Sequence, residues 1–340
     1  SMMRFYKKKM WSVQDAYQRG NGCESNSRNV GDCGLIRPME DTHQQPFKFA
    51  PKTIALIGKY QSPEVAEAVL RLANYLRGLG IAVLIEQGTA SSTGLTAGFT
   101  VASYDEIGAR ADLAVVLGGD GTLLNSACRL AEYDVPLAGV NQGRLGFLTD
   151  ISREVALEKI GEILAGRYTE ETRVLLDAEV RRGGRRVFHT LALNDVVVNK
   201  GELGRMIEFD LRIDGEYVYT QRSDGMIIST PTGSTAYALS ANGPILHPNV
   251  DGIALVPMCP HTLTARPITL PDRCRIEIVL LPPHDSRVHF DGQTRYDTRA
   301  GDTVQITRSP HNVRLLHPEG YSYFAMLREK LHWSSTPRHS

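Results

Sequence analysis

The chain has 340 residues, 42% of them hydrophobic, so it is long and apolar enough for two folded domains with buried cores. Its 38 basic and 38 acidic residues balance, which argues against binding to nucleic acid or to an anionic membrane surface. Because no run approaches the roughly 20 apolar residues of a membrane span and the cysteines form no CxxC pair, we expect a soluble, cytoplasmic protein without a disulfide framework.

Residues 1–51 show little hydrophobic periodicity and are predicted to form a poorly ordered extension. From residue 52 to residue 172, short apolar runs alternate with amphipathic helical patterns, which is typical of a parallel, Rossmann-like α/β sheet. The predicted strands are 53–58, 81–87, 111–119 and 135–141, and the predicted helices are 62–80, 122–133 and 152–166.

The pattern changes near Arg173, where extended runs with frequent turns replace the helices. Gly183-Gly184 and Asp214-Gly215 each separate two alternating runs, as the turn of a β-hairpin does. We therefore predict an all-β sandwich domain over residues 173–320. The segment 321–340 follows, and it contains a predicted helix from Tyr321 to Trp333.

A glycine-rich turn, Gly118-Gly119-Asp120-Gly121-Thr122, lies between a predicted strand and a predicted helix. Glycines allow phosphate oxygens to approach the backbone, and a helix N-terminus attracts anions. The same pattern is also compatible with a tight turn in which Asp120 caps the helix. The sequence lacks GxxxxGK[ST] and has no GxGxxG after its first strand, which disfavours a P-loop protein and an ordinary Rossmann dehydrogenase.

Three further segments concentrate polar residues and glycines. In residues 141–147, Phe147 is either a cover for a nucleobase or a core residue. Asn194-Asp195 interrupts an apolar run. The pair either faces solvent or binds ribose hydroxyls. Residues 222–240 gather hydroxyls, glycine and charge, which favours a phosphate or ribose site over a plain polar loop.

Residues 291–293 are most simply a turn between strands. Three more residues show no metal-ligand spacing, so we assign no metal to protein side chains: His247, His261 and Asp285.

Taken together, GGDGT at 118–122, NQGRLGF at 141–147, LND at 193–195 and the segment 222–248 resemble the NAD kinase family, and its bacterial, NAD-preferring branch most. The resemblance implies an α/β domain followed by a β-sandwich, with the final helix packing back on the N-terminal domain. It implies transfer of a phosphoryl group from ATP to the adenosine ribose 2′-hydroxyl of NAD, giving NADP. It also implies Mg²⁺ or another divalent cation with ATP, and a homodimer or homotetramer.

By this resemblance Asp120 is the catalytic proton acceptor, and Asp195 stands where many members have Glu. The residues expected to bind NAD or ATP are Gly118, Gly119, Gly121, Thr122, Phe147, Asn194, Asp195, Arg205, Arg222, Asp224, Thr235, Ala236, Tyr237, Ala238, Leu239, Ser240 and Gln293. Two alternatives remain: a sugar or lipid kinase that shares GGDGT, and a non-catalytic protein that binds NAD.

Overall fold

The computed structural model describes residues 50–59, 63–143, 145–201, 205–262, 264–282 and 286–333. All of these belong to one compact unit. The predicted extension, residues 1–51, lies outside the described residues except for its last two. Within the described part of the chain, no helix is long and apolar enough to cross a lipid bilayer.

The first half is a parallel sheet with helices on both faces, which confirms the predicted α/β class. Its strands lie in the order β5-β4-β1-β2-β3, so β1 and β4 are neighbours and the chain winds away from them in both directions. The elements are β1 (Thr53–Gly58), α1 (Pro63–Gly78), β2 (Ala82–Glu86), α2 (Gln87–Thr93), β3 (Thr100–Ala102), α3 (Tyr104–Arg110), β4 (Leu113–Leu117), α4 (Asp120–Leu130), η1 (Ala131–Tyr133), β5 (Leu137–Asn141), β6 (Ile151–Ser152) and α5 (Ala156–Leu164).

Side chains that alternate along β1 fill two separate cores. Ile54 and Leu56 pack with α1 and α5 on one face, whereas Ala55 and Ile57 pack with α3 and α4 on the other. Because both faces are covered, the central strands are continuously apolar, which is why their positions were readable from the sequence. The short elements α2, β3 and α3 were not predicted, since residues 87–103 are mostly small and polar.

The second half is a sandwich of antiparallel strands, which confirms the predicted β class. One layer contains β11, β10, β15, β18, β7 and β8, and the other has the order β14-β13-β12-β9-β16-β17; a shared apolar core fills the space between them. The elements are β7 (Tyr168–Arg182), β8 (Arg185–Ala192), β9 (Asp195–Lys200), β10 (Ile207–Ile213), β11 (Glu216–Ser223), β12 (Gly225–Ser229), η2 (Gly233–Thr235), α6 (Tyr237–Ser240), β13 (Gly252–Met258), β14 (Ile268–Pro271), β15 (Ile276–Leu280), β16 (Ser286–Phe290), β17 (Thr294–Thr298) and β18 (Thr303–Pro318).

Both predicted hairpins are present. Gly183 and Gly184 join β7 to β8, and Asp214 and Gly215 join β10 to β11; all four have positive φ. Glycine adopts positive φ without strain and aspartate tolerates it better than most residues, so these turn-forming residues were a reliable signal.

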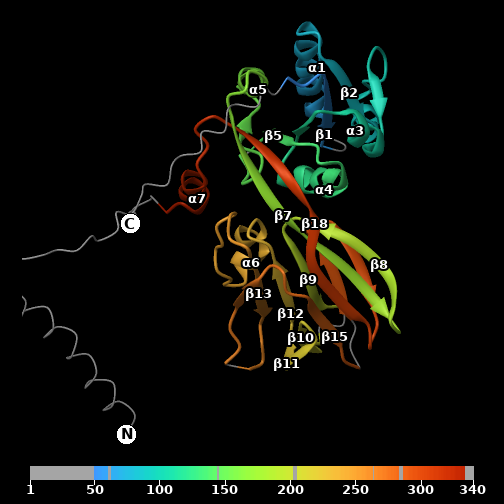
Figure 1. The fold of residues 1–340 in the computed structure, drawn as a ribbon, viewed down its shortest axis with the longest axis vertical. Helices are drawn as coiled ribbons and strands as arrows, with labels where there is room; N and C mark the ends of the chain where they lie inside the picture. Colours follow the sequence, from blue (N-terminus) through green and yellow to red (C-terminus); the bar gives the residue numbers. More distant parts are fainter. Residues whose placement is uncertain are drawn as a thin grey trace, which may run out of the picture. The chain divides into compact units, whose positions relative to one another are not determined.

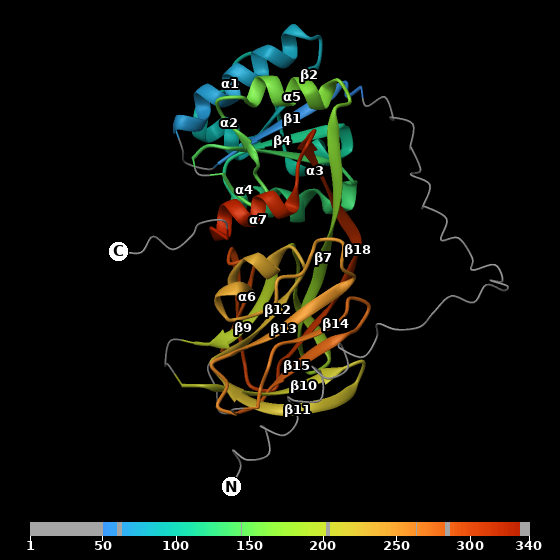
Figure 2. The same ribbon diagram turned by 90° about the vertical axis from the view of Figure 1, so that its left-hand side faces the viewer.

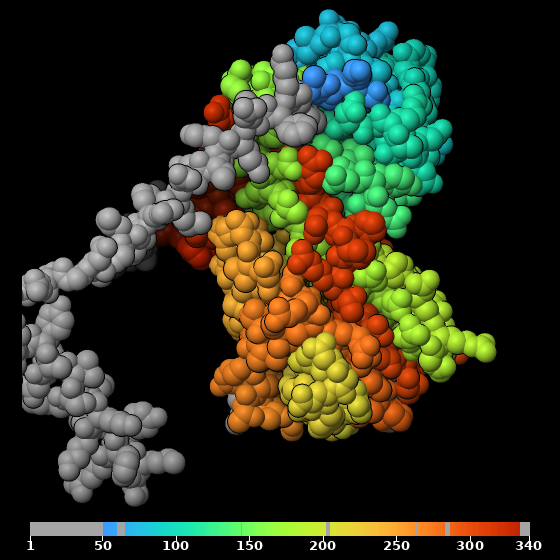
Figure 3. Space-filling model, in the orientation of Figure 1, coloured from blue at the N-terminus to red at the C-terminus, as the bar shows by residue number. Residues whose placement is uncertain are grey.

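Two long strands, β7 and β18, connect the halves (Figure 1). They pair with each other along most of their length, and Leu315 of β18 also pairs with Leu137 of β5. In Figure 3, β18 (red) reaches the surface between the atoms of the first half and the orange atoms of the second. Since β7 spans the predicted boundary at residue 172, the two halves share one continuous sheet, and the domain limits stay a prediction.

The last helix, α7 (Tyr323–Leu331), lies at the level where the two halves meet (Figure 2). Lys330 of this helix donates a hydrogen bond to the Leu145 carbonyl of the first half. The Tyr323 hydroxyl donates to the Leu246 carbonyl of the second half, at 3.3 Å. The helix therefore contacts both halves.

Candidate active site

Asp120 is the first residue of α4, directly after the end of β4 and the two glycines. The residue at the cap position is Gly119, and no side chain caps this helix, so the interpretation of Asp120 as a helix cap was wrong. Instead the Asp120 carboxylate accepts hydrogen bonds from a separate loop. Oδ1 accepts from Leu148 N at 3.1 Å, Thr149 N at 3.0 Å and Thr149 Oγ1 at 2.9 Å, and Oδ2 accepts from Phe147 N at 2.8 Å.

The 145–149 loop can reach Asp120 only because residue 146 is glycine. A Cβ at Gly146 would lie 1.9 Å from Asp120 Oδ1, far inside van der Waals contact. Asn141 supports the loop from the end of β5, donating from Nδ2 to Thr149 Oγ1 at 2.9 Å. The donors of residues 147–149 thus hold the carboxylate in one orientation, and Gly146 allows them to approach it.

A second half-buried carboxylate, Asp291, organises the part of the site that comes from the sandwich. It lies in the turn between β16 and β17 and accepts backbone N–H groups of Leu193, Asn194 and Asp195, at 2.8, 2.7 and 3.1 Å. Gln293 in the same turn donates to the Gly121 carbonyl at 2.6 Å. This turn therefore joins the LND segment to α4, a role that its Asp-Gly pattern did not reveal.

Asp195 and Asp291 lie close together with little solvent contact, and Asp195 is only 4% exposed. Burial, together with the negative charge of Asp291, raises the pKa of Asp195 to about 7. Burial also raises the pKa of Asp291, although its three backbone donors oppose that rise. Because those donors favour the charged form of Asp291, we assign the proton of the pair to Asp195 near neutral pH.

The beginning of the TPTGSTAY segment packs against Asn194. The Thr230 hydroxyl donates to the Leu193 carbonyl at 2.6 Å, and a Cβ at Gly233 would lie 2.1 Å from the Asn194 carbonyl oxygen. The structure therefore brings Asp120, Gly121, Asn194, Asp195 and Gln293 into one connected group with residues 230–233.

The predicted residues 235–240 follow this group along the chain. Tyr237 and Ser240 line a different cavity, of about 470 Å³, and Ala238 is core, while Thr235, Ala236 and Leu239 are half-buried. Arg205, Arg222 and Asp224 lie at the opposite end of β9 and β12 from Asn194, because Gly225 pairs with Asn199 while Ser229 pairs with Asp195. At about 3.3 Å per residue, that separation is roughly 16 Å along the strands. Within one chain, the structure does not bring these three residues to Asp120.

A cavity of about 760 Å³ opens beside the N-terminus of α4. Gly119, Gly121 and Thr122 line it together with Gln293, and Lys59 and Arg129 bring positive charge. Gly58 at the end of β1 forms another side, so the cavity lies where β1 and β4 diverge. This is the position at which open α/β sheets place ligands, and its size fits a nucleotide.

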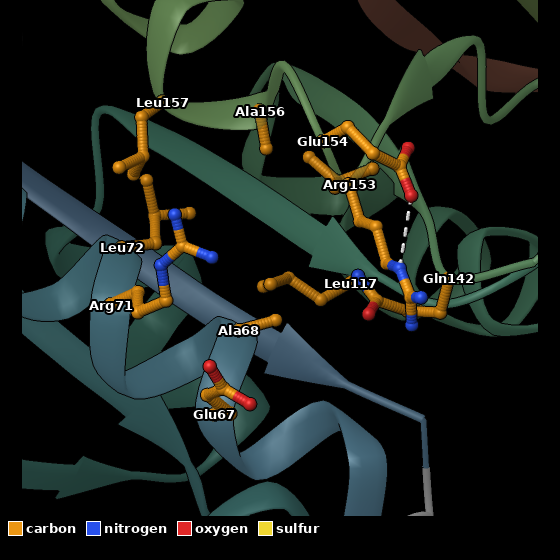
Figure 4. Close-up of a pocket in the computed structure, with 11 residues that line it drawn as sticks. Glu67, Ala68, Arg71, Leu72, Leu117, Gln142, Arg153, Glu154, Ala156 and Leu157 are labelled. Atoms are coloured by element: carbon orange, nitrogen blue, oxygen red, sulfur yellow. Dashed lines mark hydrogen bonds and ion pairs between the residues drawn. The ribbon is translucent and has the colours of Figure 1, made fainter.

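A second cavity, of about 320 Å³, lies between α1, the ends of β4 and β5, and the beginning of α5 (Figure 4). Leu72, Leu117 and Leu157 give it an apolar lining, and Arg71 and Arg153 stand on opposite sides. Gln142 extends into it, and both of its buried carboxamide atoms lack a hydrogen-bond partner among the residues that the structure describes. An unpaired buried amide costs free energy, and no sequence signal indicated this one.

Comparisons with known proteins agree with this geometry. The family profile described as the ATP-NAD kinase N-terminal domain matches residues 54–168, and the ATP-NAD kinase C-terminal domain matches residues 193–318. An NAD kinase of Aromatoleum aromaticum is 77% identical over 287 residues, covering 84% of this chain and 96% of the relative. An NAD kinase of Azoarcus sp. is 74% identical, covering 85% of this chain and 98% of the relative.

Two solved structures share the fold. The crystal structure of yeast NADH kinase complexed with NADH superposes with a TM-score of 0.78 at 25% identity, covering 85% of this chain and 90% of that chain. The NAD kinase from Archaeoglobus fulgidus in complex with ATP gives a TM-score of 0.62 at 27% identity, covering 82% of this chain and 98% of that one.

Proposed function

This chain belongs to the ATP-NAD kinase family, and on that premise we propose that Asp120 receives the hydroxyl that is phosphorylated. The adenosine ribose 2′-hydroxyl of NAD attacks the γ-phosphorus of ATP, the bond between that phosphorus and the bridging oxygen breaks, and ADP leaves. The hydroxyl proton passes to Asp120, and NADP is the product.

The hydrogen bonds of Asp120 support this role. Oδ1 already accepts three of them, whereas among the described residues only the Phe147 N–H donates to Oδ2, which leaves a lone pair for a substrate hydroxyl. Fixed backbone donors hold the carboxylate still, so little reorganisation is needed when the substrate arrives. Because phosphoryl transfer has a loose transition state, orienting the hydroxyl matters at least as much as removing its proton early.

We place ATP in the cavity beside α4, which is supported by three of its features. The backbone at Gly119 and Gly121 lets phosphate oxygens approach, the α4 N-terminus presents a positive dipole end, and Lys59 and Arg129 add charge. The dinucleotide is then expected on the side formed by Asn194, Asp195 and residues 230–233, so that the two substrates meet at Asp120.

The divalent cation is proposed to enter bound to ATP. In the described part of the chain, no group of three or more His, Cys, Asp or Glu side chains is arranged to hold a metal ion. A Mg²⁺ ion that is coordinated mainly by phosphate oxygens and water needs no such group. When bound, the cation supplies charge neutralisation at the phosphates; the residues of this chain supply positioning.

A homodimer or homotetramer is also proposed, supported by the position of Arg205, Arg222 and Asp224. These residues lie at the far end of β9 and β12 from Asn194 within one chain, so we expect them to contact a dinucleotide held mainly by a neighbouring copy. A cytoplasmic location stays a prediction. The sugar or lipid kinase and the non-catalytic alternative account for neither the 77% identity nor the two matched domains.

The test is Asp120→Asn, which keeps the size and removes the proton acceptor. We expect NADP formation from ATP and NAD to fall roughly 10²–10⁴-fold while NAD binding stays within about threefold. Turnover is followed as NADP, with a chelator arm to assess the cation, and NAD binding by calorimetry. Near-normal turnover would remove Asp120 from the proposed role.

A further inference from the structure

A chain of buried polar side chains runs from the Asp120 loop of the first half to the TPTGSTAY segment of the second. His317 Nδ1 pairs with Asp150 Oδ2 at 3.0 Å, and its Nε2 lies 3.4 Å from Glu171 Oε2. Glu171 accepts a hydrogen bond from Arg173, and Arg173 Nη1 donates to Thr232 Oγ1 at 3.2 Å. Side-chain exposure is 1% for His317, 3% for Arg173 and 7% for Asp150, so solvent screens these charges little.

Each end of this chain is attached to one half of the proposed site. Asp150 directly follows Thr149, whose N–H and hydroxyl both donate to Asp120 Oδ1. Thr232 precedes Gly233, which packs against the Asn194 carbonyl. The middle members lie on β7 and β18, the two strands that join the halves. A shift of any member therefore moves one half of the site relative to the other.

The charges balance only when His317 is protonated. Asp150 and Glu171 bring two negative charges, Arg173 brings one positive charge, and a neutral imidazole would leave one buried carboxylate uncompensated. Burial alone would lower the pKa of His317, but Asp150 and Glu171 outweigh it and raise that pKa. For Glu171, His317 and Arg173 outweigh burial and hold its pKa at about 2.

Two tyrosines, one just before α7 and one at its first residue, also face this cluster. Tyr321 stacks on the His317 ring, with centroids 3.9 Å apart, and burial raises its pKa above the ordinary tyrosine value. Burial also raises the pKa of Tyr323; the charge of Arg173 lowers this pKa and the charge of Glu171 raises it. Burial therefore favours the neutral form of both tyrosines, whereas Asp150 and Glu171 favour the charged form of His317.

We propose that His317 and Arg173 are positioning residues that hold the Asp120 loop in register with the TPTGSTAY segment. The inference deepens the proposed role of Asp120 and rests on it. Buried ion pairs are often no more stabilising than apolar residues of the same size, so stability alone is a weak reason for this cluster. The cluster instead fixes the geometry of the site. A small misplacement of reacting groups lowers the reaction rate by a large factor.

The test is His317→Gln in the full chain, which keeps a polar side chain that cannot carry charge. We expect kcat to fall roughly 10- to 100-fold while KM for ATP changes little, because positioning at Asp120 is lost and the ATP cavity is not. The wild-type kcat should decline on an alkaline limb as His317 loses its proton, and this limb should be absent in the variant. The matched control is His189→Gln, since His189 also pairs with a carboxylate, Asp177 at 2.9 Å, but lies far along β8.

A rescue variant separates positioning from folding. Asp150→Asn with His317→Gln removes one charge of each sign and leaves the Glu171–Arg173 pair intact, so it should recover kcat several-fold over His317→Gln and still lack the alkaline limb. If the single variant does not fold, this double variant carries the test alone. A folded double variant with the wild-type alkaline limb, a folded His317→Gln protein with wild-type kcat, or a wild-type profile without that limb would each overturn the proposal. Asp120→Asn is assayed in parallel, so that failure of the Asp120 role is recognised separately.

Discussion

Replacing Asp195 with asparagine should stabilise the protein above neutral pH and change little in acid. The folded protein keeps the Asp195 proton up to about pH 7, whereas the unfolded chain releases it near pH 3.9. Between these values the folded state binds more protons, so stability falls as pH rises. Each pKa unit corresponds to about 1.4 kcal/mol, and the rise from about 3.9 to about 7 therefore costs on the order of 4 kcal/mol once Asp195 is ionised.

Part of that cost is shared with Asp291, so we expect Asp195→Asn to gain about 2–4 kcal/mol at about pH 8.5 and little at about pH 4. Urea denaturation of both proteins over this range measures the difference. Asp302 provides a control of opposite sign, because Arg182 binds its two oxygens at 2.8 and 2.7 Å and helps lower its pKa against burial. Asp302→Asn should lose stability at neutral pH, and that loss should shrink as the medium becomes acidic. Parallel stability curves for wild type and Asp195→Asn would refute the reasoning.

Two further predictions concern the dinucleotide and the second cavity. Arg222→Ala should raise KM for NAD roughly 10-fold with kcat little changed, since it removes a contact made equally in ground and transition states. An unchanged KM in steady-state assays would show that Arg222 does not contact the dinucleotide. Gln142→Met should raise the free energy of unfolding by about 1 kcal/mol, because an apolar side chain of similar length replaces two buried polar atoms that have no partner within the described part of the chain. Lower stability of Gln142→Met in urea would mean that its carboxamide is paired in solution.

Much of the fold was predictable because local signals were strong. The apolar runs of β1 and β4 lie between two helical layers, and their burial on both faces makes each run continuously hydrophobic. The hairpin turns at Gly183-Gly184 and Asp214-Gly215 carry the positive φ that their residue types favour. The elements within residues 87–110 could not be predicted in this way, because α2 and β3 are short and contain few apolar residues at regular spacing.

The candidate site was predictable only where a motif carried it. Asp120 was identified from its glycines, but its bonding was not, because the Phe147 to Thr149 donors lie 27 to 29 residues away. The position of Arg222 could not be predicted from the sequence either, because it depends on which end of β12 faces the first half. Gly146 belongs to the motif, but the sequence does not say why a glycine is needed there. The structure shows that a Cβ at this position would collide with the Asp120 carboxylate.

The sequence by itself determined the two kinds of sheet, the turns and the presence of the GGDGT motif, since each depends on residues within a few positions of one another. Only the tertiary structure decided which polar groups meet. Asp291 accepts from Asn194 across 97 residues, Asp150 pairs with His317 across 167, and Gln293 bonds Gly121 across 172. Such pairs are set by how the strands of two layers are ordered, and the order of strands leaves no periodic trace in the chain.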